Sequence, residues 1–312
     1  MLSLQYYLPV CSPNYHMNKR PFFYSSSITK FPHFSNPNSC VLKFRNSICG
    51  AADADKKRFN NDDQIVLVDQ FPEGLEPELM PKHVGVIMDG NRRWAKNRGL
   101  PVQLGHRAGG KAMKQLAINC NKFGVKVVSV FAFSTENWIR PKEEVEFLMS
   151  FFEEVIKSDT KELMGHDMRV SFLGNRSRLP KSLQHLISCV EEEEAKDNKG
   201  MRLVIGMNYS GRYDITEATQ KIARKVKDGV LGVEDINESL LEQHLETNGI
   251  SNPDLLIRTS GELRVSNYML WQLAYTELLF LNKLFPDFNE ADLVEALAAF
   301  QQRRRRYGGH KY

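Results

Sequence analysis

Asp89 ends the apolar run from Val84 to Met88, and a glycine, an amide, two guanidiniums and an indole follow it directly. These five residues are Gly90, Asn91, Arg92, Arg93 and Trp94. Arginine guanidiniums bind phosphate oxygens in bidentate pairs, and a glycine lets the backbone approach a ligand closely. A carboxylate among such arginines is costly unless it holds a cation such as Mg²⁺, which proteins bind with one or two carboxylates plus substrate phosphates.

Two further polar clusters of the same character follow other apolar runs. The first consists of Ser134, Thr135, Glu136, Asn137, Trp138 and Arg140. The second consists of Arg258, Thr259, Ser260, Gly261, Glu262, Arg264, Val265, Ser266 and Asn267. A single Asp-Gly pair is usually a turn and a single arginine is usually a surface charge, but three such clusters are harder to dismiss. Together they predict a site for diphosphates with Mg²⁺, while the two tryptophans can equally serve as packing residues.

The elements that must position these clusters alternate between strand and helix. Apolar runs predict six strands, at 83–90, 125–133, 168–174, 201–210, 254–259 and 277–281. Apolar residues at helical spacing predict helices at 109–124, 141–163, 180–195, 213–228, 235–248 and 289–303. The alternation is typical of a single α/β domain with a largely parallel six-stranded sheet flanked by helices. Since ligands bind beyond the carboxyl ends of such strands, we expect the three clusters to converge on one edge of the sheet.

The first 52 residues differ in composition from the rest of the 312-residue chain. They contain no Asp or Glu, five Lys or Arg and eight Ser. An acid-free, serine-rich N-terminus with scattered bases is typical of organelle transit peptides, and we favour a plastid one over a mitochondrial one or a merely disordered tail. Residues 1–60 are therefore expected to be a disordered transit peptide and linker, with the protein in the chloroplast stroma and a catalytic domain at 80–312.

Several other classes of protein fit the sequence poorly. A net charge of +4 does not by itself indicate a nucleic-acid partner. No run reaches the 18 apolar residues of a membrane span, and no Gly-x-x-x-x-Gly-Lys-Ser/Thr pattern indicates a nucleotide-binding P-loop. Only Cys120 and Cys189 follow the leader, without a Cys-x-x-Cys spacing, so neither zinc nor a disulfide framework is expected.

Four stretches of the sequence resemble the signature blocks of the cis-prenyltransferases. They are "MDGNRRWAK" (88–96), "FAFSTENWIRPKEEVEFLM" (131–149), "NYSGRYDI" (208–215) and "LLIRTSGELRVSNYMLWQLAYTEL" (255–278). This family includes the bacterial undecaprenyl diphosphate synthases and plant plastid relatives, and the resemblance extends over residues 80–312 in the family's order. It implies an α/β fold with an apolar tunnel, and an Mg²⁺-dependent condensation of isopentenyl diphosphate with an allylic diphosphate that creates a cis double bond.

The resemblance also implies a role for each matching residue. Asp89 would bind Mg²⁺ and help the diphosphate leave, Asn137 would assist proton removal, and Glu277 would join the metal site across the interface of a homodimer. The residues that would cradle the allylic diphosphate are Gly90, Asn91, Arg92, Arg93 and His106. Those that would line the two substrates are Ser134, Thr135, Glu136, Trp138 and Arg140, with Trp94 bordering the allylic chain. Those that would hold isopentenyl diphosphate are Arg258, Arg264 and Ser266.

Departures from the family's pattern concern substrate choice. Arg92 and Ser260 stand where bacterial members have glycine, and Val102 stands where they carry a phosphate-contacting arginine. The helix at 141–163 would border the tunnel, and its phenylalanines predict a short- to medium-chain product, of ten to fifteen or about fifty carbons. Homodimerisation, no nucleic acid and at most a peripheral membrane contact for product release are expected. The alternatives are a non-catalytic partner subunit of a heteromeric enzyme and a phosphatase or phosphate-binding protein on a similar sheet.

Overall fold

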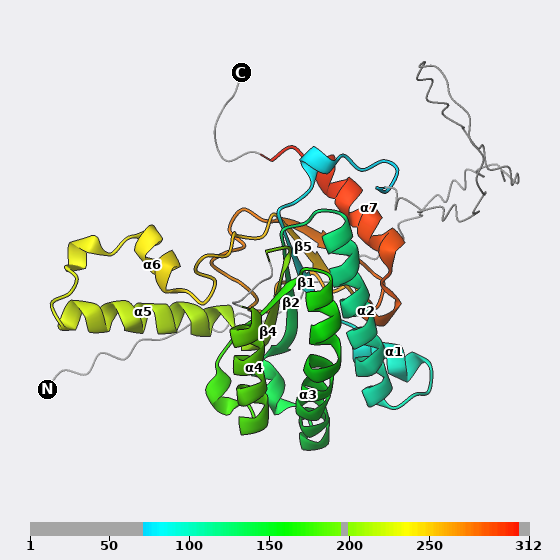
Figure 1. Cartoon of the computed structure of the whole chain (residues 1–312), viewed down its shortest axis with the longest axis horizontal. Helices are drawn as coiled ribbons and strands as arrows, with labels where there is room; N and C mark the ends of the chain where they lie inside the picture. Colours follow the sequence, from blue (N-terminus) through cyan, green and yellow to red (C-terminus); the bar gives the residue numbers. More distant parts are fainter. Residues whose placement is uncertain (1–70, 195–198, 306–312) are drawn as a thin grey trace, which may run out of the picture. The chain divides into compact units, whose positions relative to one another are not determined.

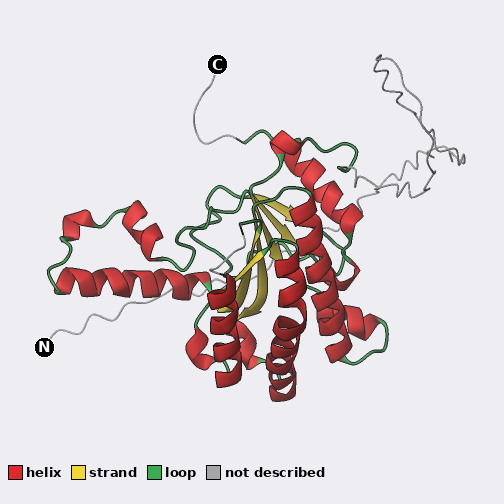
Figure 2. Ribbon diagram, in the orientation of Figure 1, coloured by secondary structure: helices red, strands yellow, loops and turns green. Residues whose placement is uncertain are grey.

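The computed structural model describes residues 71–194 and 199–305, and their centre is one six-stranded parallel sheet (Figure 2). Its strands are β1 (His83–Ile87), β2 (Val127–Ser134), β3 (Arg169–Leu173), β4 (Arg202–Tyr209), β5 (Leu255–Arg258) and β6 (Glu277–Phe280). They lie in the order β3-β4-β2-β1-β5-β6, and every neighbouring pair is parallel. All six predicted strands are therefore confirmed, within a few residues at their ends.

The described helices lie around this sheet as Figure 1 shows. They are α1 (Asn91–Asn97), α2 (Val102–Lys122), α3 (Lys142–Gly165), α4 (Lys181–Glu194), α5 (Gly211–Lys227), α6 (Glu238–His244) and α7 (Glu290–Gln301). In this view α2, α3 and α4 stand side by side across one face, whereas α5 and α6 form a pair that projects away from the sheet. No described helix is both long enough and apolar enough to cross a bilayer.

The two faces of the sheet bury different amounts of apolar surface. Alternate residues of β1 point to opposite faces, so Val84 and Val86 join the large apolar cluster shared with α2, α3, α4 and α7. Ile87 joins a smaller cluster, in which Tyr268 and Met269 from the segment between β5 and β6 are fully buried. Most of the core therefore lies under α2, α3 and α4, and an irregular segment covers part of the other face.

Three helical predictions need correction. The helix predicted at 109–124 begins at Val102, after Pro101 in the N-cap position, and α1 was not predicted. The first part of α2 is rich in glycine, which is a poor helix former, so the sequence did not predict a helix there. The composition of the apolar segment 268–275 suits either a contact helix or a part of the core; the segment forms turns, and its first residues are core. The helix expected at 235–248 is confined to α6, which ends at His244.

The sheet order explains why distant sequence clusters meet. Strand β1 lies between β2 and β5, and all three run in the same direction. Their carboxyl ends, which carry the three polar clusters, therefore form one continuous edge. Two predictions lie outside the described residues. One is the transit peptide at 1–60. The other is the motif Arg306-Tyr307-Gly308, which resembles the C-terminal Arg-x-Gly of the cis-prenyltransferases.

Candidate active site

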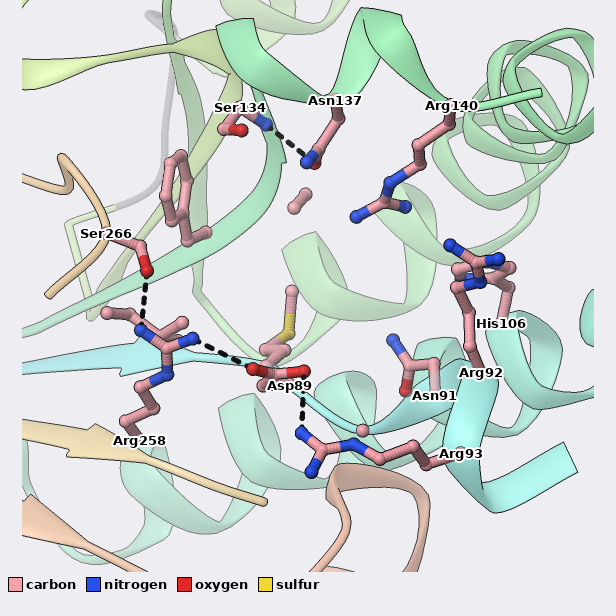
Figure 3. Close-up of a pocket in the computed structure, with 15 residues that line it drawn as sticks. Asp89, Asn91, Arg92, Arg93, His106, Ser134, Asn137, Arg140, Arg258 and Ser266 are labelled. Carbon is pink, nitrogen blue, oxygen red and sulfur yellow. Dashed lines mark hydrogen bonds and ion pairs between the residues drawn. The ribbon is translucent and has the colours of Figure 1, made fainter. Parts of the chain in front are cut away.

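Asp89 lies between two arginines at the carboxyl edge of the sheet (Figure 3). One carboxylate oxygen accepts a hydrogen bond from Arg258 Nη2 at 2.9 Å, and the other lies 3.5 Å from Arg93 Nη2. The Arg258 side chain is only 4% exposed and also donates to Ser266 Oγ at 2.7 Å. Glu262 lies 3.1 Å from Arg93. The carboxylate is thus held in place by cations that come from β5 and α1.

The backbone of Asp89 is fixed as firmly as its side chain. Thr259 Oγ1 donates to the Asp89 carbonyl oxygen at 2.7 Å and accepts the Asp89 N–H at 3.0 Å. Thr259 is fully buried. Gly90 follows with a φ of 110°, a conformation open to glycine but strained for other residues. A Cβ there would also approach Leu284 to within 2.9 Å. Glycine at position 90 therefore serves both the turn and the packing that aim Asp89.

The cluster after β2 forms a short 3₁₀ helix, η2 (Thr135–Ile139), with Ser134 in the N-cap position. The Asn137 side-chain oxygen accepts the Ser134 N–H at 3.1 Å, so the side-chain nitrogen is the end that remains for the cavity. Trp138 points elsewhere, because its Nε1 donates to Asn208 Oδ1 at 2.7 Å and its ring packs against Phe133. Helix η2 thus presents Asn137 to the site and uses Trp138 as an anchor.

A second carboxylate, Glu144 on α3, gathers three cationic or titratable groups. Its oxygens lie 3.3 Å from Arg140 Nη1, 3.5 Å from Arg92 Nε and 3.3 Å from His106 Nε2. Burial lowers the pKa of His106 despite the hydrogen bond to Glu144, so the ring is neutral at pH 7. Burial also lowers the pKa of Arg140, which stays protonated at neutral pH. Glu144 thus links α1, α2 and the segment after η2.

These groups surround a cavity of about 430 Å³ at the carboxyl edge. Predicted residues that line it are Asp89, Gly90, Asn91, Arg92, Arg93, His106, Ser134, Asn137, Arg140, Arg258 and Ser266. A second, apolar cavity of about 80 Å³ shares Met88, Asn91, His106 and Ala132 with the first. It extends between α2, α3 and the sheet, and Phe151 and Phe152 line it. The polar cavity, called the mouth below, therefore adjoins the small apolar cavity, called the chamber.

Several predicted residues do not line the polar cavity, and their side chains have other partners. Trp94 Nε1 donates to Asp287 at 2.7 Å, and its ring lies under the Arg98 guanidinium. Arg264 pairs with Glu262. The others outside the cavity lining are Thr135, Glu136, Trp138 and Glu277. The interpretation of the two tryptophans as packing residues therefore describes the structure better than direct contact with a ligand.

Glu277 lies at the amino end of β6, whereas Asp89 follows the carboxyl end of β1. Within one chain these residues are at opposite edges of the parallel sheet, and Glu277 pairs with Arg303 at 2.8 Å. A shared metal site would thus need Glu277 from a second copy. The described residues contain no cluster of three His, Cys, Asp or Glu side chains that could hold a metal ion without ligand oxygens.

The sequence did not reveal the supporting residues Glu144 and Thr259. Glu144 sits in the first turn of α3, where acidic residues are common because they favour the helix dipole, so its type carries no signal. Thr259 stood within a recognised cluster, but only the parallel pairing of β1 with β5 brings it to the Asp89 backbone. Asn91 is also notable: Cβ atoms on Gly105 and Gly109 would approach its backbone and side-chain oxygens to 2.1 and 2.4 Å.

Comparison with known proteins gives consistent matches. The model of the Prenyltransf family, described as undecaprenyl diphosphate synthase, matches residues 87–308. Dehydrodolichyl diphosphate synthase 2 of Arabidopsis thaliana is 55% identical over 243 residues, 77% of this chain and 78% of that protein. Cis-prenyltransferase 7, chloroplastic, of Solanum lycopersicum is 57% identical over 253 residues, which are 80% of this chain and 85% of that protein. The crystal structure of lavandulyl diphosphate synthase from Lavandula x intermedia with dimethylallyl diphosphate matches with a TM-score of 0.72 and 46% identity, covering 74% of this chain and 100% of that chain.

Proposed function

This chain belongs to the undecaprenyl diphosphate synthase family of cis-prenyltransferases, and we propose that it condenses isopentenyl diphosphate with an allylic diphosphate to give a short- to medium-chain Z-polyprenyl diphosphate. The observation that carries this proposal is the pairing of two cavities. A mouth lined by arginines suits two diphosphates, and an adjoining apolar chamber suits the hydrocarbon of the growing chain.

The reaction breaks the bond between the allylic carbon and its diphosphate oxygen, and joins that carbon to isopentenyl diphosphate. The methylene group of isopentenyl diphosphate then loses a proton. Arg92 and Arg93, at the start of α1, would bind the allylic diphosphate and stabilise the charge that develops as it leaves. Arg258 and Ser266 would hold the second diphosphate. Asn137 is an amide and too weak a base to remove the proton alone, so it would orient the group that does.

Magnesium fits the residues of the mouth only in part. Asp89 is the carboxylate that faces the cavity, and it is already paired with Arg258 and Arg93. One carboxylate with diphosphate oxygens is a common Mg²⁺ ligand set, so Asp89 would hold the ion, with Glu277 of a second copy as a further ligand. When bound, Mg²⁺ would neutralise diphosphate charge and make the leaving group better.

The alternative of a non-catalytic partner subunit is not favoured. Four of the side chains that the resemblance assigns to metal binding, proton removal and diphosphate binding line one cavity, namely Asp89, Asn137, Arg258 and Ser266. A subunit without its own activity has no need to keep these groups together. A phosphatase is not favoured either, because no residue of the mouth stands in the setting of an activated nucleophile.

We propose a homodimer from the surface around β6. This strand is one of the two edge strands of the sheet, and all four of its residues are partly exposed. Tyr275 and Leu263 on the neighbouring segment are 72% and 76% exposed. Apolar side chains beside an open edge fit a contact with a second copy. Sedimentation of a fully active monomer would contradict this assembly.

A chloroplast location is supported by the names of similar plant proteins, five of which are called chloroplastic. We propose that residues 1–60 are a transit peptide and linker that direct the protein to the stroma, and that 80–312 form the catalytic domain. A fluorescent protein fused behind residues 1–60 should enter chloroplasts. Retention in the cytosol would contradict this proposal, as would unfolding of a chain that starts at Ala52.

The small size of the apolar chamber supports a short product. Its volume is about 80 Å³, and the Phe151 ring lies so close to α2 that a Cβ on Gly110 would be 2.8 Å from its Cζ. Growth beyond the first additions would require Phe151 or Phe152 to move from a close-packed wall. We therefore favour the ten- to fifteen-carbon option over fifty carbons, and exclude rubber-length chains.

Incubation with defined substrates tests the reaction directly. The purified protein is mixed with Mg²⁺, isopentenyl diphosphate and, in separate reactions, dimethylallyl, geranyl, farnesyl or geranylgeranyl diphosphate, and the products are sized. We expect chain extension of at least one primer, strict dependence on Mg²⁺ and a cis double bond in the product. Release of inorganic phosphate without carbon–carbon bond formation would indicate a phosphatase instead.

A further inference from the structure

The segment between β5 and β6 carries unusual backbone strain beside the active site. Four of its non-glycine residues have a positive φ: Ser260 (83°), Ser266 (47°), Asn267 (63°) and Met269 (43°). Such conformations persist only where surrounding contacts hold them, and they cluster at functional sites. The same segment supplies Ser266, which accepts a hydrogen bond from Arg258 in the polar cavity. A specific anchor must therefore keep Ser266 in place.

Asn267, the next residue, makes four hydrogen bonds that join three separate parts of the fold. Its backbone oxygen accepts the Gly211 N–H at 2.7 Å, and its Oδ1 accepts the Arg212 N–H at 2.9 Å. Both donors belong to the first turn of α5. Its Nδ2 donates to Ser210 Oγ at 3.0 Å and to Glu136 Oε1, in η2, at 2.7 Å. Asparagine tolerates the positive φ better than most residues, so its type suits both the conformation and the contacts.

The contact with Glu136 joins the two sides of the cavity mouth. Burial favours the neutral form of Glu136, but hydrogen bonds from Asn267 and from the start of η2 hold its pKa below the ordinary value. The carboxylate is thus charged at neutral pH, and a hydrogen bond to it is stronger than one between neutral groups. Glu136 precedes Asn137, and Asn267 follows Ser266, so this one bond spans the neighbours of two cavity-lining residues.

We propose that Asn267 is a positioning residue that fixes the separation of η2 and the β5–β6 segment, and thereby the half of the site that binds isopentenyl diphosphate. The inference rests on the proposed function. Asn267 does not line the cavity and would not touch substrate. It acts by holding Ser266 and Asn137 in their relative positions before a substrate arrives, which lowers the ordering cost of binding.

The substitution Asn267→Asp tests this role with little change in shape. Aspartate keeps the tolerance for positive φ and the acceptor for the Arg212 N–H, but it removes the donor to Glu136 and places two carboxylates together. We expect KM for isopentenyl diphosphate to rise about ten- to a hundredfold, with kcat within about threefold, because a charge-assisted bond that organises binding is lost. Asn121→Asp is the matched control, since Asn121 donates to the His166 carbonyl far from the mouth.

Combination with Glu136→Gln separates positioning from general charge effects. The glutamine amide can donate to an aspartate at 267, so the hydrogen bond is restored in the reverse direction. In the Glu136→Gln background, we expect the factor by which Asn267→Asp raises KM to be at least about tenfold smaller than in the wild-type background. An independent effect of the added charge on the diphosphate would give the same factor in both backgrounds, and that result would overturn the proposal.

Two further measurements test the role of Asn267 if the Asn267→Asp variant does not fold or if the proposed function is wrong. If Asn267→Asp does not fold, Asn267→Gly keeps the backbone conformation without the side-chain bonds, and an unchanged KM there overturns the proposal. If the wild-type chain transfers no prenyl group, the proposed function fails and hydrogen exchange at residues 260–269 decides the anchor role. Faster exchange in Asn267→Asp, but not in Asn121→Asp, supports it, and equal exchange overturns it.

Discussion

The two edges of the parallel sheet each hold an aspartate that is paired with arginine, yet the pairs serve different ends. At the amino edge, one oxygen of Asp254 accepts the N–H groups of Lys82 and His83, and the other pairs with Arg305. These bonds join the starts of β1 and β5 to the chain after α7. The charges there are matched and the backbone donors are satisfied, which is the arrangement of a structural ion pair.

At the carboxyl edge, arginines outnumber the carboxylates with which they pair. Asp89 is shared by Arg258 and Arg93, and Glu144 is shared by Arg92 and Arg140. Among the described residues, the buried Arg258 Nε and Asn91 Oδ1 beside the cavity have no hydrogen-bond partner, and neither have the buried Arg169 Nε and Arg202 Nε at the amino ends of β3 and β4. Surplus positive charge and unused donors and acceptors cost stability unless a ligand completes them. The two edges therefore differ in charge balance, because two arginines share each carboxylate at the carboxyl edge whereas Asp254 pairs with one arginine.

Replacement of Asp89 is the strongest test of this difference. Asp89→Asn keeps the size and one acceptor for Arg258 but removes the charge that would hold Mg²⁺. We expect turnover to fall about a thousandfold, because assisted departure of diphosphate supplies several kcal/mol of transition-state stabilisation at 1.36 kcal/mol per factor of ten. Steady-state kinetics at saturating Mg²⁺ measure the effect. Turnover within tenfold of the wild type would show that Asp89 is no more functional than its counterpart at the amino edge.

The apolar chamber below the carboxyl edge gives a second test. Phe151→Ala removes a ring that lines the chamber, and we expect products longer by one or more isoprene units because the freed volume continues the path of the chain. Phe147 does not line the chamber and stacks on Phe151, with ring centroids 5.7 Å apart. Phe147→Ala is thus the control and should change product length less. Identical products from both variants would mean that α3 does not set the stop.

The sequence predicted the carboxyl edge well because its signal was local. Each strand there is a continuous apolar run ended by polar residues, and parallel strands bring such ends together without knowledge of side-chain geometry. The fold class, the six strands and most residues around Asp89 therefore followed from pattern. The direction of individual side chains did not, because Trp94 and Trp138 lie one helical step from cavity residues yet point to Asp287 and Asn208.

Features that depend on tertiary packing escaped prediction. The start of α2 was missed because its glycines, which let Asn91 approach the helix closely, have low helix propensity. The segment 268–275 has a helical composition, but buried Tyr268 and Met269 hold it in turns. The amino edge gave no signal, since Asp254 before a strand is an ordinary turn residue. Its importance appears only when three distant segments are seen to meet on one carboxylate.

Asp254→Asn should have the opposite effect to the one expected for Asp89→Asn. The amide can no longer accept on both sides, so either the two backbone N–H groups or Arg305 lose a charged partner. We expect a loss of about 3 kcal/mol in the free energy of unfolding, typical of hydrogen bonds to charged groups, with turnover of the folded enzyme within about threefold. Denaturant titration and kinetics of the same sample measure both. Lost turnover with unchanged stability would contradict the division between the two edges.

The smallest predicted effect is the pH dependence that His83 gives to the amino edge. Its ring is buried between the Ser251 carbonyl and Ser129 Oγ, and burial lowers its pKa to about 4, although Asp254 opposes the shift. Below the unfolded pKa of about 6.5 the unfolded chain takes up a proton that the folded chain refuses. Stability must therefore fall as the pH drops from 6.5 towards 4, and His83 accounts for about 2 kcal/mol between pH 7 and pH 5.

His83→Gln cannot titrate, so the free energy of unfolding of this variant, measured by denaturant titration, should fall less over the same pH interval than that of the wild type. An equal loss in both proteins would place the acid sensitivity elsewhere, with His106 at the carboxyl edge, whose pKa is lowered in the same direction, as the next residue to replace.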